Sequence, residues 1–309
     1  MAMASTSPAR LKFWGVRGSI PVPGPSTIRY GGNTSCVEVR ADGEIIVLDA
    51  GTGIRSHGIA LEDEFGSNPI KLSLLITHVH WDHIQGFPFF GPSYHDKNQI
   101  RIYGYDGADA GLRESFKGQM ATPFFPVELL NLPGKLSIKR LKTMEFNIGK
   151  VGVVAKFMNH PGVCVGYRLN TSAGSMAFLP DTEPYDAHKL HASKSDSLSP
   201  GQIQKRAKEE RTELVKFLEG CDVLILDSQY TDEEYKDHVG WGHGSLSTAV
   251  ALASDAKIRK LILFHHDPNH DDAAIDEMVK KARGLVAERS KSLEVIAATE
   301  GQELLLQQK

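Results

Sequence analysis

The densest group of potential metal ligands occupies residues 78–83, which read His-x-His-x-Asp-His. Imidazole nitrogens and carboxylate oxygens suit a borderline divalent cation such as zinc. His78 and His80, separated by one residue on extended backbone, can reach the same cation, whereas Asp82 and His83 are displaced by a turn and can hold a second one. Two cations about 3.5–4 Å apart are a recurrent device for hydrolysis. The spacing therefore predicts a dinuclear metal site, and a polar loop of solvated histidines is the alternative.

The apolar runs around this motif predict how it is positioned. Leu72–Ile76 is separated from the motif by Thr77 alone and is predicted to be a buried strand, so the ligands emerge at its carboxyl end, where α/β folds place their ligands. Earlier strands are expected over 11–16 and 37–49, with a hairpin turn at Asp42-Gly43. Later strands alternate with helices, which indicates the α/β class. The helices are expected over 202–218, 245–256 and 273–286.

The motif at residues 78–83 resembles the signature of the metallo-β-lactamase superfamily. This resemblance implies an α/β fold, the αββα sandwich of two mixed β-sheets flanked by helices, with a dinuclear centre in the cleft between the sheet edges. With 309 residues, 41% of them hydrophobic, the chain can bury a substantial core. We therefore expect a single domain of this fold over residues 11–309, after a flexible N-terminus formed by residues 1–10.

The resemblance also implies further ligands, each of which follows an apolar run. His160 matches the third histidine of the first metal, Asp181 the carboxylate that bridges both metals, and His265 the last ligand of the second. Successive strand residues point to opposite faces, so only one member of the doublet His265-His266 should reach the metal; the alignment favours His265 and leaves His266 for a core contact. Asp49 resembles the aspartate that braces the metal-binding loop. The expected ligands are His78, His80, Asp82, His83, His160, Asp181 and His265.

A carboxylate and an imidazole outside this ligand set form a second expected pair. Asp227 ends an apolar run, and His243 lies in a glycine-rich segment ahead of an expected helix. The arrangement resembles the phosphodiesterase branch of the superfamily, which includes ribonuclease Z and in which an acidic residue orients a histidine. His243 would contact the scissile phosphate or protonate the leaving alkoxide, which needs an acid with a pKa near neutrality. We expect His243, Asp227 and Asp82 to be catalytic; a histidine that caps the following helix is the alternative for His243.

Two further segments, 13–19 and 264–272, resemble a bacterial subgroup related to cyclic-nucleotide phosphodiesterases. The resemblance implies that the protein is a metal-dependent hydrolase of small phosphodiesters, cyclic nucleotides above all, which acts through a metal-bridging hydroxide. The implied cofactors are two divalent metal ions, zinc in the first place, with manganese and iron as alternatives. A metal-dependent lactonase or β-lactamase, and a non-catalytic metal-binding ligand sensor, are the alternative functions.

Charge and composition limit the partners and the location. A net charge of −3 without a long basic run argues against a large nucleic-acid footprint, so nucleic acid is not an expected partner. No apolar run approaches the roughly 18 residues of a membrane span, and residues 1–9 lack the apolar core of a secretion signal. Cys36, Cys164 and Cys221 are an odd number, which suggests reduced buried thiols. We therefore expect a cytoplasmic protein with no membrane partner.

Several other features leave alternatives open. The aromatic and proline-rich segments 87–92 and 120–127 border the substrate pocket or a homodimer interface in one interpretation, and pack in the core in the other. Arg17 is either a bidentate donor to phosphate or part of a structural salt bridge. Residues 184–201 are expected to form a mobile surface insertion, in which His188 and His191 are exposed to solvent.

Overall fold

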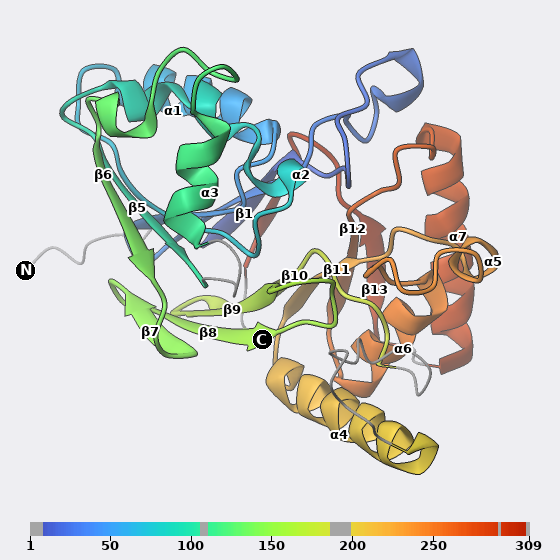
Figure 1. The fold of residues 1–309 in the computed structure, drawn as a ribbon. Helices are drawn as coiled ribbons and strands as arrows, with labels where there is room; N and C mark the ends of the chain where they lie inside the picture. The colour runs from blue at the N-terminus through green and yellow to red at the C-terminus, as the bar shows by residue number, and fades with distance from the viewer. Residues whose placement is uncertain (1–8, 106–110, 186–198, 290–291, 307–309) are drawn as a thin grey trace, which may run out of the picture.

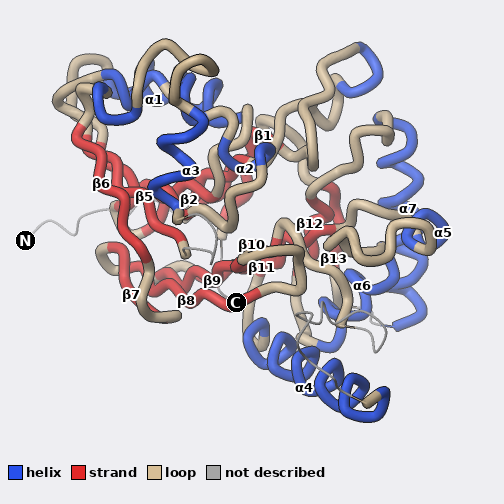
Figure 2. Tube along the Cα trace, viewed as in Figure 1, coloured by secondary structure: helices blue, strands red, loops and turns tan. Residues whose placement is uncertain are grey.

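The computed structural model describes residues 9–105, 111–185, 199–289 and 292–306. Within these residues, two β-sheets of seven strands pack face to face, and helices cover the outer face of each sheet (Figures 1 and 2). This arrangement is the αββα sandwich that the sequence predicts. Residues 1–8, together with His188 and His191, lie outside the described residues, as does most of the expected insertion.

The first sheet has the strand order β14-β1-β2-β3-β4-β5-β6. Its pairs are antiparallel from β14 to β3 and parallel from β3 to β6. The predicted hairpin turn joins β2 to β3, with Asp42 and Gly43 both at positive φ, 54° and 84°, which is the backbone that Asp-Gly favours in a two-residue turn. The strands are β1 (Arg10–Gly15), β2 (Cys36–Ala41), β3 (Glu44–Leu48), β4 (Lys71–Leu75), β5 (Gln99–Gly104), β6 (Lys135–Arg140) and β14 (Glu303–Leu305).

The second sheet has the order β13-β12-β11-β10-β9-β8-β7. Its pairs are parallel from β13 to β10 and antiparallel from β10 to β7. The expected site residues lie at or just after the carboxyl ends of β8, β10, β11 and β12, because the strands that carry them run toward the same region of the molecule. The strands are β7 (Glu145–Ile148), β8 (Val151–Phe157), β9 (Val165–Thr171), β10 (Gly174–Leu179), β11 (Val223–Asp227), β12 (Lys260–Phe264) and β13 (Glu294–Ala297).

The helices bury apolar side chains on the outer faces of the two sheets. One core cluster lies between α1, α2 and α3 and the first sheet, a second lies between α4, α6 and α7 and the second sheet, and a third joins the two sheets. None of the described helices is both long and apolar enough to cross a membrane. The helices are α1 (Gly53–Phe65), α2 (Trp81–Ile84), α3 (Leu112–Gln119), α4 (Pro200–Leu218), α5 (Asp232–Tyr235), α6 (Leu246–Asp255) and α7 (Asp272–Arg289).

Arg17 adopts neither of the two expected roles. Its side chain is fully buried, and its guanidinium donates to three backbone carbonyls. The distances are 2.8 Å from Nε to Gly31 O, 3.1 Å to Asp267 O and 2.6 Å to His270 O. Arg17 therefore joins the loop after β1 to the loop after β12. The three cysteines are buried and unbridged, as predicted.

A buried carboxylate connects β2 to α1. Glu38 Oε2 accepts from Trp14 Nε1 at 3.2 Å, and Glu38 Oε1 pairs with Arg40 and lies 3.6 Å from His57 Nε2. Arg40 also forms a bidentate pair with Glu64 on α1, with distances of 2.5 and 2.7 Å. Burial raises the pKa of Glu38, but the neighbouring His57 and Arg40 outweigh this effect and lower the pKa to about 2. The folded protein therefore favours the ionised form of Glu38.

This pKa predicts how the contribution of Glu38 to stability depends on pH. A carboxylate whose pKa is lowered by folding stabilises the protein above its ordinary pKa, and the stabilisation disappears as pH falls from about 4.5 toward 2. Glu38→Gln should lower the free energy of unfolding at pH 7 by about 2–3 kcal/mol. The difference from wild type should shrink steadily below pH 4.5 in urea titrations. Glu128→Gln, at an exposed residue, is the control, and a pH-independent loss in the Glu38 variant would contradict the prediction.

Candidate metal centre

The ligand motif leaves β4 and enters one turn of helix. His80 is the N-cap of α2 and has an extended backbone, with φ −63° and ψ 153°, whereas Asp82 and His83 lie within α2. The change from extended to helical backbone aims the two pairs of side chains in different directions. His78 and His80 join one group of potential ligands, and Asp82 and His83 join another.

The first group consists of His78, His80, His160 and Asp181, whose ligand atoms lie within 4.8 Å of one another. His160 Nε2 is 3.1 Å from His80 Nδ1. Asp181 Oδ2 is 3.6 Å from His78 Nε2 and 3.7 Å from His160 Nε2. Three strand ends therefore supply one compact set of nitrogen and oxygen atoms.

The second group consists of Asp82, His83 and His265. Asp82 Oδ2 is 3.1 Å from His83 Nε2 and 3.0 Å from His265 Nε2. Asp181 faces this group as well, because its Oδ1 is 3.1 Å from His83 Nε2 and 3.4 Å from His265 Nε2. Asp181 thus turns one carboxylate oxygen toward each group, which is the arrangement that a bridging ligand requires.

The spacing of these atoms fits the coordination of cations. Two ligands at about 2.1 Å from one tetrahedral cation lie roughly 3.4 Å apart, and the distances between the facing atoms range from 3.0 to 3.7 Å. Within the described part of the chain, His78 Nε2, His83 Nε2 and Asp181 Oδ1 are buried without a hydrogen-bond partner. Unpaired buried polar atoms are costly. The donor set therefore fits two divalent cations.

The charges of the cluster favour the same conclusion. Burial lowers the pKa of His78 well below its ordinary value and that of His160 to about 4. Both imidazoles are thus kept neutral, as metal ligands must be. Burial also lowers the pKa of His83, but the surrounding carboxylates, Asp181 foremost, raise it well above its ordinary value. Positive charge is favoured at this position, and a divalent cation would supply it.

Hydrogen bonds behind the ligands fix three of the imidazole rings. In each ring Nδ1 has a partner on the far side, which leaves Nε2 directed toward the cluster. The pairs are His83 with Asp49 Oδ2 at 2.7 Å, His160 with Gly242 O at 2.9 Å, and His265 with Gln229 Oε1 at 2.8 Å. Of these three partners, only Asp49 is predicted from the sequence, because nothing in the local pattern marks an amide or a backbone carbonyl as a partner of a distant histidine.

Asp49 connects the end of β3 to the ligand motif. It is fully buried, and it accepts hydrogen bonds from Ser35 Oγ at 3.0 Å and from the backbone N of Thr77 at 2.9 Å, in addition to His83. Its φ of 62° is in the left-handed region, where a residue other than glycine is held only by strong surrounding contacts. Asp49 therefore positions both the backbone and one ring of the motif.

Two glycines allow the backbone to approach ligand rings closely. A Cβ atom on Gly18 would lie 2.3 Å from the ring of His265, and one on Gly242 would lie 2.3 Å from His160 Nδ1. Gly242 also has a φ of 89°, which other residues adopt only with strain. Any larger residue at these two positions would displace a potential ligand.

The structure separates the two histidines of the 265–266 doublet. His265 has a left-handed backbone, with φ 60°, and its Nε2 faces Asp82. His266 is buried away from the cluster, where its Nε2 donates to Ala298 O at 3.0 Å. Burial lowers the pKa of His266 to about 3, so it is a neutral donor in the core. The two side chains thus occupy the places that the sequence interpretation gave them.

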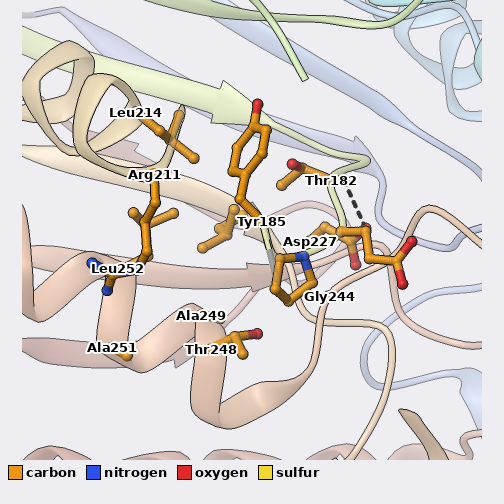
Figure 3. Close-up of a pocket in the computed structure, with 13 residues that line it drawn as sticks. Thr182, Tyr185, Arg211, Leu214, Asp227, Gly244, Thr248, Ala249, Ala251 and Leu252 are labelled. Carbon is orange, nitrogen blue, oxygen red and sulfur yellow. Dashed lines mark hydrogen bonds between the residues drawn. The ribbon is translucent and has the colours of Figure 1, made fainter. Parts of the chain in front are cut away.

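His243 lies beside the cluster and is oriented by Asp227. His243 Nδ1 donates to Asp227 Oδ2 at 2.9 Å, and the ring stacks on that of His265, with centroids 4.8 Å apart. Asp227 Oδ2 also accepts from the backbone N of Thr182 at 3.1 Å, the bond drawn in Figure 3. The N-cap of α6 is Ser245, so His243 does not cap this helix. Behind the pair, a cavity of about 100 Å³ separates α4 from α6 (Figure 3).

Glu183 holds the loop that carries His243, a role for which the sequence offered no sign. Its side chain is buried. Its Oε1 accepts from the backbone N of Gly240 at 2.7 Å and from Tyr235 Oη at 2.9 Å, and its Oε2 accepts from the backbone N of Gly242 at 3.3 Å. Because Glu183 follows Asp181 by two residues, one short segment positions both the shared carboxylate and the His243 loop.

Comparisons with known proteins agree with this geometry. Residues 45–266 match the family described as "Beta-lactamase superfamily domain". The chain is 24% identical to ribonuclease Z of Pyrococcus horikoshii over 276 residues, which cover 77% of this chain and 82% of that protein. Unliganded yeast PDE1 has a similar structure, with a TM-score of 0.67, 17% identity and coverage of 97% of this chain and 99% of that one. A diphosphatase of the PhnP family has a TM-score of 0.63, 16% identity and coverage of 97% and 100%.

Removing the charge of Asp49 should weaken metal binding. In Asp49→Asn the side-chain amide cannot accept from Ser35, Thr77 and His83 together, and supporting groups of this kind typically change metal affinity about 10- to 100-fold. Competition with a chromophoric chelator for Zn²⁺ measures the effect. Asp63→Asn, at an exposed residue of α1, is the matched control. Unchanged affinity in the Asp49 variant would show that Asp49 does not support the ligands.

Proposed function

The chain belongs to the metallo-β-lactamase superfamily, and we propose that it is a metal-dependent hydrolase of phosphodiesters, with cyclic nucleotides as the preferred substrates. The ligands in this proposal are His78, His80 and His160 for one cation and Asp82, His83 and His265 for the other, with Asp181 shared. Two divalent cations in these positions would lower the pKa of water and neutralise charge on phosphoryl oxygens. Zinc suits the nitrogen-rich donor set, with manganese and iron as alternatives.

The position of His243 is the observation that carries the phosphodiesterase proposal. Its ring stacks on His265 of the second ligand group, and His243, Asp181 and His265 form a third cluster whose ligand atoms lie within 4.8 Å of one another. In this proposal the seven ligands named above hold the cations, and His243 contacts the substrate. Burial lowers the pKa of His243, but Asp227 outweighs burial and raises the pKa to about 9. A protonated imidazole beside the cluster can donate to the alkoxide that leaves from a phosphodiester.

The residues around the cluster have different roles in the proposed hydrolysis. Asp227 accepts from His243 Nδ1 and holds the ring so that Nε2 is the atom that contacts the substrate. His243 binds a phosphoryl oxygen in the ground state and transfers its proton to the departing ribose oxygen. Asp82 acts as a ligand of the second cation in this proposal, and the backbone N of Ser19 donates to its Oδ2 at 2.8 Å. Thr182 and Gln229 keep Asp227 in place through their backbone N atoms, at 3.1 and 3.0 Å.

RNA is the second candidate substrate. The expectation that nucleic acid is not a partner finds no support in the comparisons, because the curated relatives are named ribonuclease Z. The same site chemistry would cleave a phosphodiester of RNA. The net charge of −3 favours a small substrate, since proteins that bind long nucleic acids usually present an extensive basic surface.

A substrate panel with metal analysis tests the proposed function. The zinc-loaded protein should hydrolyse bis(p-nitrophenyl) phosphate and cyclic nucleotides, lose activity in a chelator and regain it when Zn²⁺ or Mn²⁺ returns. A transfer RNA precursor, a lactone and a β-lactam complete the panel. Turnover of the lactone or lactam alone would reject the phosphodiesterase, and turnover of RNA alone would reject the preference for cyclic nucleotides.

His243→Ala should reduce turnover according to the leaving group. General acid catalysis typically contributes about 10²- to 10⁴-fold, so hydrolysis of a cyclic nucleotide, with its poor alkoxide leaving group, should fall by that factor. Hydrolysis of bis(p-nitrophenyl) phosphate should fall much less, because p-nitrophenolate leaves without a proton. Metal content should stay unchanged. An equal fall with both substrates would remove the proton-donor role, and a loss of metal would reassign His243 to the ligands.

A further inference from the structure

The side-chain amide of Gln229 connects the potential ligand His265 to a buried carboxylate, that of Asp267. Gln229 Oε1 accepts from His265 Nδ1 at 2.8 Å, and Gln229 Nε2 donates to Asp267 Oδ2 at 3.0 Å. Gln229 Nε2 also donates to Tyr230 Oη at 3.1 Å. Gln229, His265 and Asp267 are all buried. The three side chains therefore form a continuous hydrogen-bonded row that leads away from the ligand cluster.

The partners of Asp267 decide how the amide of Gln229 is oriented. Asp267 Oδ1 accepts from the backbone N and from Nδ2 of Asn269, at 2.8 and 3.0 Å. Asp267 Oδ2 is then the oxygen that faces Gln229, and a carboxylate oxygen can only accept. The amide must turn its NH2 group toward Asp267, which leaves its Oε1 for His265. The carboxylate of Asp267 thus fixes which end of the amide contacts the ring.

This orientation selects the form of His265 that can bind a cation. A neutral imidazole carries its proton on one nitrogen, and a metal binds the other. Because Gln229 Oε1 can only accept, it requires the proton on His265 Nδ1, so that the lone pair of Nε2 is directed toward the cluster. An amide with the opposite orientation would direct an N–H group at Nδ1. The proton would then be favoured on Nε2, where it blocks a bond to a metal.

A turn-forming role accounts for only some of the contacts of Asp267. An aspartate oxygen that accepts from the backbone N two residues further on stabilises a turn, and asparagine can do the same. That role uses Oδ1 alone. Oδ2 faces Gln229, which is 38 residues away in the chain. The contact with Gln229 is the one that requires a carboxylate, because an asparagine with Oδ1 in the turn would direct its NH2 group at the NH2 group of Gln229.

We propose that Asp267 is a positioning residue, which orients the amide of Gln229 and through it keeps the proton of His265 on Nδ1. This inference rests on the proposed function, because it takes His265 as a ligand of the second cation. Groups behind a metal-bound histidine commonly fix its tautomer and its ring orientation. An amide can do so only when another residue determines its orientation, since it offers both a donor and an acceptor.

Asp267→Asn should weaken the binding of one cation. In this variant the two NH2 groups at positions 267 and 229 oppose each other, and Gln229 relieves the conflict by directing its own NH2 group at His265. Competition with a chromophoric chelator should show two tightly bound equivalents of Zn²⁺ in the wild type. In the variant, one equivalent should bind as before and the other about 10- to 100-fold more weakly. Asp271→Asn, at an exposed residue of the same loop, removes the same charge and should leave both equivalents unchanged.

A second substitution distinguishes this positioning role from a general loss of structure. In the double variant Asp267→Asn/Gln229→Glu, the amide at position 267 can donate to the carboxylate at position 229, whose other oxygen accepts from His265 Nδ1. The link is reversed, but the proton stays on Nδ1. The weakened equivalent should therefore bind as tightly as in the wild type or more tightly. In zinc-loaded protein with ¹⁵N-labelled histidine, the Nδ1–H signal of His265 should be present in the wild type and the double variant and absent from Asp267→Asn.

These measurements need no substrate, so they separate this inference from the proposed function. Rescue in the double variant without hydrolysis of any phosphodiester would uphold the role of Asp267 and reject the proposed activity. Wild-type affinity for both equivalents in Asp267→Asn, or a double variant that binds no better than the single one, would overturn the role of Asp267. A wild-type protein that binds no zinc would overturn this role together with the proposed ligand set.

Discussion

The buried carboxylate of Asp181, placed between two sets of imidazoles, is the constraint on which the site depends. A carboxylate in such a position must be compensated, because an ion removed from water is stable only with opposite charge or several hydrogen bonds around it. The surrounding rings face Asp181 at 3.1–3.7 Å. Among the described residues, His78 Nε2, His83 Nε2 and Asp181 Oδ1 have no hydrogen-bond partner. The fold therefore brings together nitrogen and oxygen atoms of the kinds that bind divalent cations. The proposed chemistry depends on this clustering of ligand atoms.

The sandwich architecture explains how distant segments meet at this carboxylate. The potential ligands follow the carboxyl ends of β4 in the first sheet and of β8, β10 and β12 in the second. Hydrogen bonds behind the rings then fix which nitrogen faces inward. These contacts come from Asp49 in the first sheet and from Gln229 and the His243 loop in the second, so the geometry of the cluster depends on both sheets packing correctly.

Several residues with unusual backbone conformations lie at the site. Asp49 and His265 both adopt left-handed backbone, and Gly18 and Gly242 permit contacts that a Cβ atom would block. Such strain persists only when surrounding contacts fix it, and it gathers at functional sites.

Local patterns in the amino-acid sequence predict the α/β class, most strands and helices near the site, the Asp42-Gly43 turn and the types of residue available as ligands, since periodicity and turn chemistry are local properties. The seven potential ligands also come together as the resemblance implied, and their binding of metal is proposed above. The cytoplasmic location and the homodimer stay predictions from the sequence. Only the three-dimensional structure shows that Arg17 binds backbone carbonyls and that Gln229 and Glu183 support the site. These contacts join residues far apart in the chain, and their partners are chosen by the packing of two sheets, which no local pattern encodes.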